Sequence, residues 1–192
     1  MSGTGDALAL VELDSIARGY RVLDAMVKRS PVEILEANLV EPGKYLILFA
    51  GGVAEVEESY SAALEAGAGH HLDAMLLPMV HGAIVPGLRG YHNCEEPDTI
   101  GVIEATSVAA MLESCDRSLK DAEVVLAGLR LTPALGGKAF FVVHGEQADV
   151  EAAAEIAGAV LLERKVQIEV IARPHEDFLA YLLRPAPFRV ET

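Results

Sequence analysis

The hydrophobic and polar positions of this chain follow the same order twice. Each half begins with a short apolar stretch, starting at Ala7 or Thr99, and each stretch is followed by a serine, Ser15 or Ser107. A serine at this place can accept a hydrogen bond from the free amides of a first helical turn. The pattern therefore predicts a strand and then a capped helix at the start of each half.

Both predicted helices carry one apolar face. Their apolar residues recur at steps of three and four positions, which is the spacing of one side of a helix. These residues are Ile16, Tyr20, Leu23 and Val27 in the first half, and Val108, Met111, Cys115 and Leu119 in the second.

The rest of each half predicts a hairpin and a second helix. A partly alternating strand near residues 32–34, a loop and an apolar run (YLILF or AFFVV) predict the hairpin. The second helix is expected to begin near Val53 and Gln147, and to stop at Gly67 in the first half. In the second half, alternating residues at 166–173 predict a closing strand.

The two halves are copies of one domain. Before the hairpin loop, matching residues such as Glu12 and Glu104 lie 92 positions apart, and after it, residues such as Gly43 and Gly137 lie 94 apart. The second copy therefore has two additional loop residues. Self-similarity this regular is stronger evidence than any single short motif.

The repeated order of elements predicts an α+β fold. We expect two tandem α/β sandwich domains of ferredoxin-like size, each an antiparallel sheet with helices on one face. The first domain is placed at residues 1–81, and the second, with a C-terminal tail, at residues 99–192. Residues 82–98 have the Gly, Pro and polar content of a linker.

Composition and charge argue against several classes of protein. No apolar run approaches the roughly 20 residues of a membrane-spanning helix, and the N-terminus lacks the basic region of a secretory signal, so we expect no membrane partner. The net charge of −14 disfavours nucleic acid as a partner, because binding phosphates requires clustered basic residues. Cys94 and Cys115 are too few for a disulfide framework, and Cys115 is expected to be a small buried residue.

Motifs for catalysis or metal binding are not apparent in the sequence. Gly43-Lys44 begins a strand, whereas a phosphate-binding loop needs its glycines and lysine at the start of a helix. Gly51-Gly52 precedes a helix, where a turn glycine is a commoner explanation than an anion site. The six histidines do not have the spacing of a zinc site. We therefore expect that the protein is not an enzyme and that it has no catalytic residue, no metal site and no cofactor.

Several motifs together resemble the shell proteins of bacterial microcompartments, specifically the tandem-domain members that form trimers. They are the helix endings LDAMVKRSPVEIL and CDRSLKDAEVVL, the hairpin loop with its Gly-Lys exit, the G-x-x-A-[DE]-V-E opening of the second helix, and IARPHEDF at residues 171–178. The resemblance implies a structural protein in which three two-domain chains imitate a hexamer. This flat, six-sided tile would pack into the shell facets and carry a central pore for metabolites. The duplication fits, because a closed ring of six domains then needs three chains.

The resemblance also implies which residues line the pore. They are Val40, Glu41, Pro42 and Gly43 in the first copy, and Thr132, Pro133, Ala134, Leu135, Gly136 and Gly137 in the second. Some tandem members carry a cysteine at the position of Glu41, and three such thiolates can hold an iron–sulfur cluster. This chain lacks that cysteine, so no cluster is expected.

A second implied set of residues lies at the tile edge. In the family, a lysine near the end of the first helix packs against the neighbouring tile, and Lys28 and Lys120 match it. An arginine before a Pro-His pair lies at the same edge, and Arg173 matches it. The first copy departs from the pattern with Leu77 at the corresponding place, and Arg89 is a candidate substitute.

The expected partners are two further copies of the chain, other shell proteins (hexamers and pentamers) and small metabolites in the pore. The expected location is a microcompartment shell in the bacterial cytoplasm. One alternative is a tandem ferredoxin-like regulator that senses a small ligand at a domain interface, and another is a small enzyme with an unrecognised site. Formation of sheets or tubes would favour the shell protein, whereas ligand-dependent stabilisation without assembly would favour the regulator.

Overall fold

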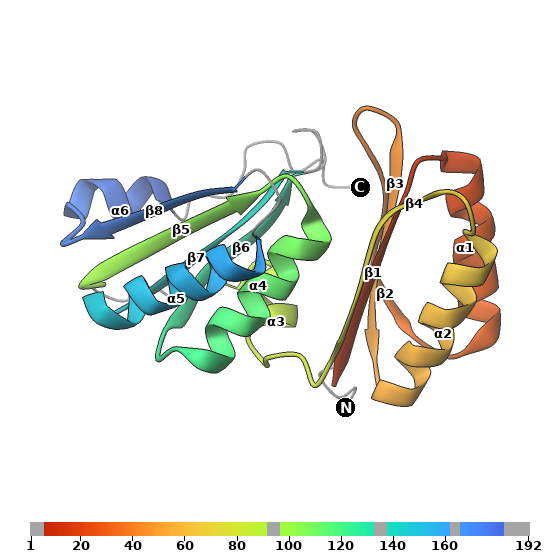
Figure 1. Cartoon of the computed structure of the whole chain (residues 1–192), viewed down its shortest axis with the longest axis horizontal. Helices are drawn as coiled ribbons and strands as arrows, with labels where there is room; N and C mark the ends of the chain where they lie inside the picture. The colour runs from red at the N-terminus through yellow and green to blue at the C-terminus, as the bar shows by residue number, and fades with distance from the viewer. Residues whose placement is uncertain (1–5, 92–96, 133–137, 162–165, 183–192) are drawn as a thin grey trace.

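The computed structural model describes residues 6–91, 97–132, 138–161 and 166–182, which form two domains (Figure 1). In chain order, the first domain contains β1 (Ala7–Leu13), α1 (Ile16–Arg29), β2 (Glu33–Val40), β3 (Lys44–Gly51), α2 (Val53–Ala66), β4 (His71–Pro78) and α3 (Ile84–Leu88). The second contains β5 (Thr99–Ala105), α4 (Val108–Asp121), β6 (Val125–Thr132), β7 (Lys138–Gly145), α5 (Gln147–Val160), β8 (Val166–Ala172) and α6 (Glu176–Leu182).

The two domains have the same topology. Each is built on a four-stranded antiparallel sheet, with strand order β2-β3-β1-β4 in the first domain and β6-β7-β5-β8 in the second. The register is repeated as well, since Glu12 lies opposite Leu46 and Glu104 lies opposite Phe140. The predicted α+β class and the predicted duplication are therefore confirmed.

The predicted helix caps are present in both copies. The Oγ of Ser15 accepts a hydrogen bond from the N–H of Arg18 at 3.3 Å, and the Oγ of Ser107 accepts one from the N–H of Ala110 at 3.2 Å. Gly67 is the C-cap of α2, as expected from the sequence. These local signals fix where the helices begin and end.

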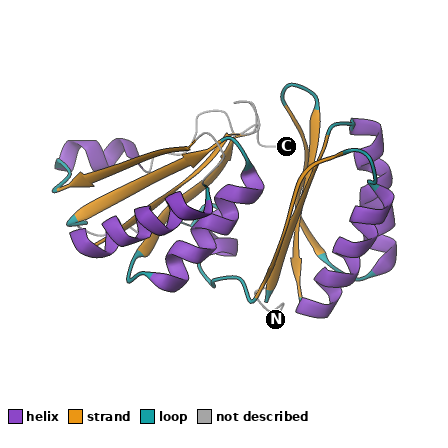
Figure 2. Ribbon diagram, in the orientation of Figure 1, coloured by secondary structure: helices purple, strands orange, loops and turns teal. Residues whose placement is uncertain are grey.

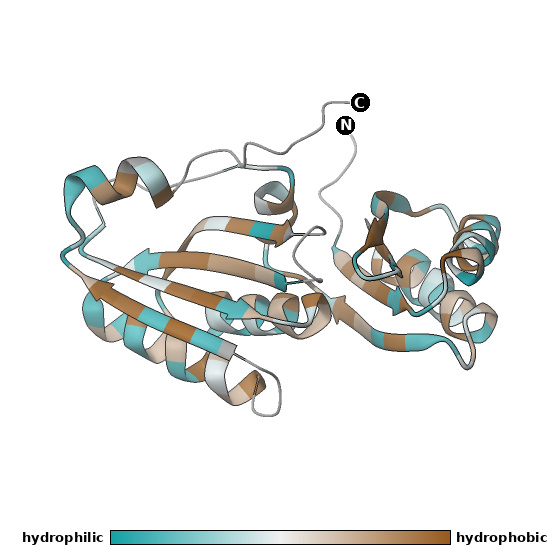
Figure 3. Ribbon diagram, turned by 90° about the horizontal axis from the view of Figure 1, so that it is seen from above, coloured by the Kyte–Doolittle hydropathy of each residue, from teal (hydrophilic) through white to brown (hydrophobic). Residues whose placement is uncertain are grey.

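The long helices of each domain cover one face of its sheet, α1 and α2 in the first domain and α4 and α5 in the second (Figure 2). The opposite side of each sheet is called here its back face. Along β1, Ala7, Ala9 and Val11 pack with α1 and α2, whereas Leu8 and Leu10 point to the back face and join a cluster that includes α4. Both faces of β1 are therefore buried, one under helices of its own domain and the other under α4 of the second domain. Figure 3 shows apolar residues, in brown, along the strands of both sheets.

Only part of the apolar face predicted for α1 packs on its own sheet, namely Leu23. The buried residues of α1 are Gly19, Val22 and Met26, while Ile16 and Tyr20 are exposed. A Cβ atom on Gly19 would lie 2.3 Å from Cδ1 of Tyr45, so the glycine permits the close approach of that ring. The core side of α1 thus includes a residue that a hydrophobic pattern cannot detect.

Part of the segment expected to be a linker is ordered structure. α3 lies within residues 82–98, and its Ile84 and Val85 are buried at the junction between the domains. The strand β4 and the helix α6 were also not assigned from the sequence pattern. Within the described parts of the chain, all helices are too short to cross a membrane.

Cys115 is completely buried, as the sequence predicts, and it belongs to the cluster shared by the two domains. Burial raises the pKa of its thiol well above the usual range, and Asp116 adds to the shift. A thiol held in this neutral form is a poor nucleophile, so Cys115 acts as a small apolar residue. Cys94 lies outside the described residues.

Candidate functional site

The most extensive built surface of this molecule is the junction between its domains. The back face of the first sheet packs against α4, which lies between the two sheets (Figure 1). Leu8, Leu10 and Leu48 of this back face belong to the same buried cluster as Met111 and Leu112 of α4. The contact is head-to-tail, because a sheet of one domain meets a helix of the other.

Hydrogen bonds also connect the domains around this apolar contact. The N–H of Val108, at the start of α4, donates to Oε1 of Glu12 at 3.3 Å. The hydroxyl of Ser107 donates to Oδ2 of Asp73. At the other end of α4, the N–H of His81 donates to Oδ1 of Asp116 at 2.7 Å.

Glu12 is a buried carboxylate next to the last residue of the apolar strand β1. Its side chain is 4% exposed, and its Oε2 lies 3.6 Å from the Nζ of Lys44. Burial raises the pKa of Glu12, and the neighbouring Asp73 adds to this shift. Lys44 and the N–H of Val108 act in the opposite direction and lower the pKa. The free amides at the N-terminus of α4 also favour a negative charge at this place.

The second domain contains the same carboxylate without a covering helix. Glu104 corresponds to Glu12, its Oε1 lies 3.0 Å from the Nζ of Lys138, and its side chain is 42% exposed. Strand register places Gln167 opposite Glu104, where Asp73 lies opposite Glu12. The back face around Glu104 is partly open, since Val102 and Phe140 are only partly buried.

The outer face of α1 is the open counterpart of the buried face of α4. Leu112 of α4 is 0% exposed, and the residue 92 positions earlier, Tyr20 of α1, is 60% exposed. The same contrast holds for Val108 and Leu119, which are buried, and for Ile16 and Val27, which are exposed. The back face of the second sheet is covered in part by Phe178, Leu179 and Leu182 of α6. Each chain therefore presents one partly open sheet face and one open helix face, and these are the two kinds of surface that meet at its internal junction.

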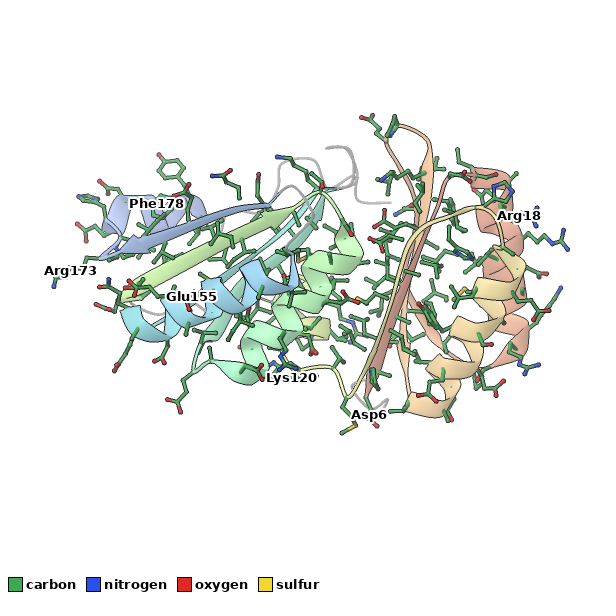
Figure 4. All side chains as sticks on the ribbon, in the orientation of Figure 1. Asp6, Arg18, Lys120, Glu155, Arg173 and Phe178 are labelled. Carbon is green, nitrogen blue, oxygen red and sulfur yellow. The ribbon has the colours of Figure 1, made fainter. Side chains whose placement is uncertain are left out.

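The predicted edge lysines occupy equivalent places near the ends of their helices. The Nζ of Lys28 lies 2.6 Å from Oδ2 of Asp24, and the Nζ of Lys120 lies 2.6 Å from Oδ2 of Asp116. The first pair is exposed, whereas Asp116 is buried because the turn that contains His81 covers it. Figure 4 shows Lys120 beside the junction between the domains, and Arg173 at the far end of the second sheet.

The structural counterpart of Arg173 is Met79, and the sequence-based match to Leu77 is wrong. Ala7 pairs with Pro78 and Thr99 pairs with Ala172, so the next residues, Met79 and Arg173, are equivalent. Both have a positive φ, 56° and 49°. Met79 is exposed, and the first copy thus places an apolar side chain where the second places a cation. The other candidate, Arg89, instead pairs with Glu33.

The first predicted pore loop is the turn between β2 and β3. Val40 is buried, whereas Glu41, Pro42 and Gly43 are exposed. The N–H of Gly43 donates to the carbonyl of Val40 at 3.0 Å, and the φ of Gly43 is +122°, a conformation that favours glycine.

The second predicted pore loop is only partly described. Thr132 ends β6, and Pro133, Ala134, Leu135, Gly136 and Gly137 lie outside the described residues. In Figure 1 the first loop and the adjoining ends of β6 and β7 lie on the same side of the molecule. The pore assignment therefore remains a prediction for both loops.

Sequence reasoning did not find the role of Glu12, although a signal was present. A carboxylate near the end of an apolar stretch occurs in both copies, at Glu12 and Glu104, and a buried charge requires a partner. Among the described residues, the His, Cys, Asp and Glu side chains form no group that could hold a metal ion. The hydrogen bond that Glu12 accepts from Val108 instead joins the two domains.

Comparison with known proteins gives consistent matches over both domains. A model of the BMC domain matches residues 7–80 and residues 99–174. The chain is 31% identical to the bacterial microcompartment shell protein PduT of Citrobacter freundii over 173 residues, or 89% of this chain and 94% of that protein. It is 35% identical to the shell protein EutM of Salmonella typhimurium over 83 residues, which are 42% of this chain and 83% of that protein.

Two solved structures are similar as well. A microcompartment protein from Desulfitobacterium hafniense has a TM-score of 0.81 and 34% identity, with 91% of this chain and 98% of that chain covered. A fused, permuted hexameric shell protein of the RMM microcompartment has a TM-score of 0.56 and 20% identity, with 81% and 84% covered, and shares the fold.

Proposed function

This chain belongs to the BMC-domain family of bacterial microcompartment shell proteins, and from that premise we propose that three copies close into a ring of six domains. Such a ring is the flat, pseudohexagonal tile expected from the sequence. Its role is structural rather than catalytic. Its location is a microcompartment shell in the bacterial cytoplasm, where its partners are other shell proteins, both hexamers and pentamers.

The observation that carries this proposal is the head-to-tail junction within one chain. The back face of the first sheet binds α4, and the same two surfaces recur as the partly open back face of the second sheet and the open face of α1. A head-to-tail contact repeated between identical chains generates a ring when the rotation closes. With two domains in each chain, a six-domain ring contains three chains.

The contacts between chains follow from those within the chain. Glu104 of one copy would accept a hydrogen bond from the N–H of Ile16 of the next copy, as Glu12 does from Val108. Ser15 would lie beside Gln167 of the neighbour, as Ser107 lies beside Asp73. The exposed Tyr20 would be buried, as Leu112 is.

The outer edge of this ring alternates between two chemical types. Within a chain, Asp116 links Lys120 to the turn that follows Met79. Between chains, the equivalent contact brings Lys28 to the turn that follows Arg173 of the neighbour. Three edge sites would therefore combine lysine with methionine, and three would combine lysine with arginine.

The centre of the ring is the proposed pore. Three copies of the exposed β2–β3 loop, with Glu41 at its tip, would alternate with three β6–β7 loops. A rim of three carboxylates favours cations and neutral polar metabolites over anions.

The mass of the assembly in solution tests this proposal. We expect light scattering or sedimentation at micromolar concentration to give the mass of three chains, and electron microscopy of concentrated protein to show sheets or tubes. A monomer that forms no assemblies and is stabilised by a small ligand would contradict the ring and support the ligand-sensing regulator. A dimer would contradict it as well.

A further inference from the structure

The short helices α3 and α6 are equivalent parts of the two copies. The N–H of Ile84 donates to the carbonyl of His81, and the N–H of Phe178, 94 positions later, donates to the carbonyl of His175. Both helices follow a residue with positive φ. Their sequences, IVPGL and FLAYL over the matching positions, share apolar residues at the first, second and fifth places. The fourth place differs most, since it holds Gly87 in α3 and Tyr181 in α6.

Gly87 lies at the junction between the domains, against the edge strand β6 (Figure 1). A Cβ atom on Gly87 would lie 2.9 Å from Cδ2 of Leu126 and 3.4 Å from Cβ of Leu129. Both leucines are buried. A side chain at position 87 would therefore require Leu126 to shift.

One of the two corresponding positions of the first domain holds a smaller side chain. Leu126 and Leu129 lie opposite Val143 and Phe141, and their counterparts on β2 are Ile34 and Ala37, opposite Phe49 and Ile47. Alanine lacks the branched end of leucine, so the side chain at this place on β2 is smaller than the one on β6. Ile34 and Ala37 are partly exposed.

We propose that Tyr181 of one copy packs against Ala37 and Ile34 of the next copy. The inference rests on the three-chain ring, in which α6 meets the neighbour's β2 as α3 meets β6 within the chain. Tyr181 is 66% exposed, although its counterpart lies in a buried contact. Within the chain, the small helix residue Gly87 thus faces the large strand residue Leu129. Between chains, the large helix residue Tyr181 would face the small strand residue Ala37.

This exchange of sizes specifies which domains become neighbours. Tyrosine facing Leu129 would overlap with it, and glycine facing Ala37 would leave a void, so either exchanged pairing is weaker than the proposed one. An aromatic ring that is buried on association also contributes much apolar area. The pair therefore favours a ring in which first and second domains alternate, and it disfavours contacts between two first or two second domains.

A double-variant experiment on the full chain tests the pair. The dissociation constant of the trimer is measured by sedimentation for the parent, Tyr181→Gly, Ala37→Leu and the double variant. We expect each single change to weaken the trimer at least about tenfold, the first by loss of the ring and the second by overlap. The double variant recreates the Gly87–Leu129 combination, and we expect it to recover most of the lost affinity.

Controls separate this inference from the ring itself and from misfolding. Tyr181→Phe retains the ring and should associate like the parent, and circular dichroism checks the fold of every variant. If the parent is a trimer and neither single variant changes its dissociation constant, the pair is wrong while the ring stands. The same conclusion follows if the double variant raises the dissociation constant by the product of the two single effects. A parent that is not a trimer would overturn the ring. If Ala37→Leu does not fold, then equal affinity of Tyr181→Gly and Tyr181→Phe would by itself reject the contact.

Discussion

Glu12 of β1 accepts a hydrogen bond from the N–H of Val108 at the start of α4, over 3.3 Å and across the junction between the two domains. The two residues are 96 positions apart in the chain. A buried carboxylate is thus satisfied by a helix N-terminus of the other domain and by Lys44 of its own. This contact joins the copies into one unit and serves as the template for the contact between chains.

The raised pKa of Glu12 gives a first prediction, on pH and stability. The folded-state pKa lies above the ordinary value of 4.5, so the folded protein binds a proton here at a pH where the unfolded chain does not. The stabilisation from this group is full below pH 4.5 and is lost as the pH rises through the raised value. Compared with Glu12→Gln, the parent should therefore gain free energy of unfolding when the pH falls from 7 toward 4.5.

Urea unfolding at several pH values, analysed as parent minus variant, measures this difference. Glu104→Gln is the matched variant in the second copy, where the side chain is 42% exposed. A difference between parent and Glu12→Gln that does not change over this pH range would contradict the assigned environment of Glu12.

A second prediction contrasts the open face of α1 with the buried face of α4. Tyr20→Glu should abolish the trimer but lower the stability of the single chain by about 1 kcal/mol, through loss of its ring contact with Tyr45 at 5.2 Å. Leu112→Glu, at the corresponding place, should destabilise the chain by at least about 3 kcal/mol, because it buries a charge at the domain junction.

Thermal and urea unfolding of the dissociated chain, together with sedimentation, distinguishes the two effects. Tyr20→Phe is the conservative control and should remain trimeric. A Tyr20→Glu variant that associates like the parent would show that α1 does not face another chain.

A third prediction concerns the edge of the ring. Replacement of Lys28 and Lys120 together by Glu should prevent sheets and tubes while the trimer remains folded. Lys28 pairs with the exposed Asp24 one helical turn earlier, and such a pair stabilises a helix by about 0.5 kcal/mol at most. Lys120 pairs with the buried Asp116, so its replacement costs more stability than that of Lys28. Like charges across a contact between tiles would repel.

Electron microscopy reports sheet formation, and sedimentation reports the trimer. Arg117→Glu is a suitable control, because Arg117 forms an equally spaced pair with Asp121 on the same helix as Lys120. Sheets formed by the double lysine variant as readily as by the parent would remove both lysines from the edge.

A fourth prediction concerns the pore rim. Glu41→Gln should raise the passage of a small anion relative to a neutral solute of the same size, because three rim carboxylates oppose anions. The measurement compares the two solutes in shells built with parent or variant protein. Glu57→Gln, which removes an exposed carboxylate of α2, controls for the change in net charge. Identical ratios in all three shells would leave the β2–β3 loop as a structural rim without a role in selectivity.

The sequence alone determined the local elements and their repetition. Ser15 and Ser107 mark helix starts, and the apolar runs of the hairpins mark strands, because caps and periodicity depend on residues that are close in the chain. The constant spacing between matching residues, such as Glu12 and Glu104, then predicts two copies of one domain. This repetition can be read without any knowledge of the tertiary structure.

The tertiary structure decided which of the repeated surfaces are buried. Tyr20 and Leu112 have the same place in the helical pattern, yet only Leu112 is covered, because the covering sheet belongs to the first domain. The burial of Glu12, the equivalence of Met79 with Arg173 and the place of α3 at the junction depend in the same way on strands and helices that are distant in sequence. Periodicity specifies that a face is apolar, but the element that covers this face is fixed only when non-local parts of the chain pack together.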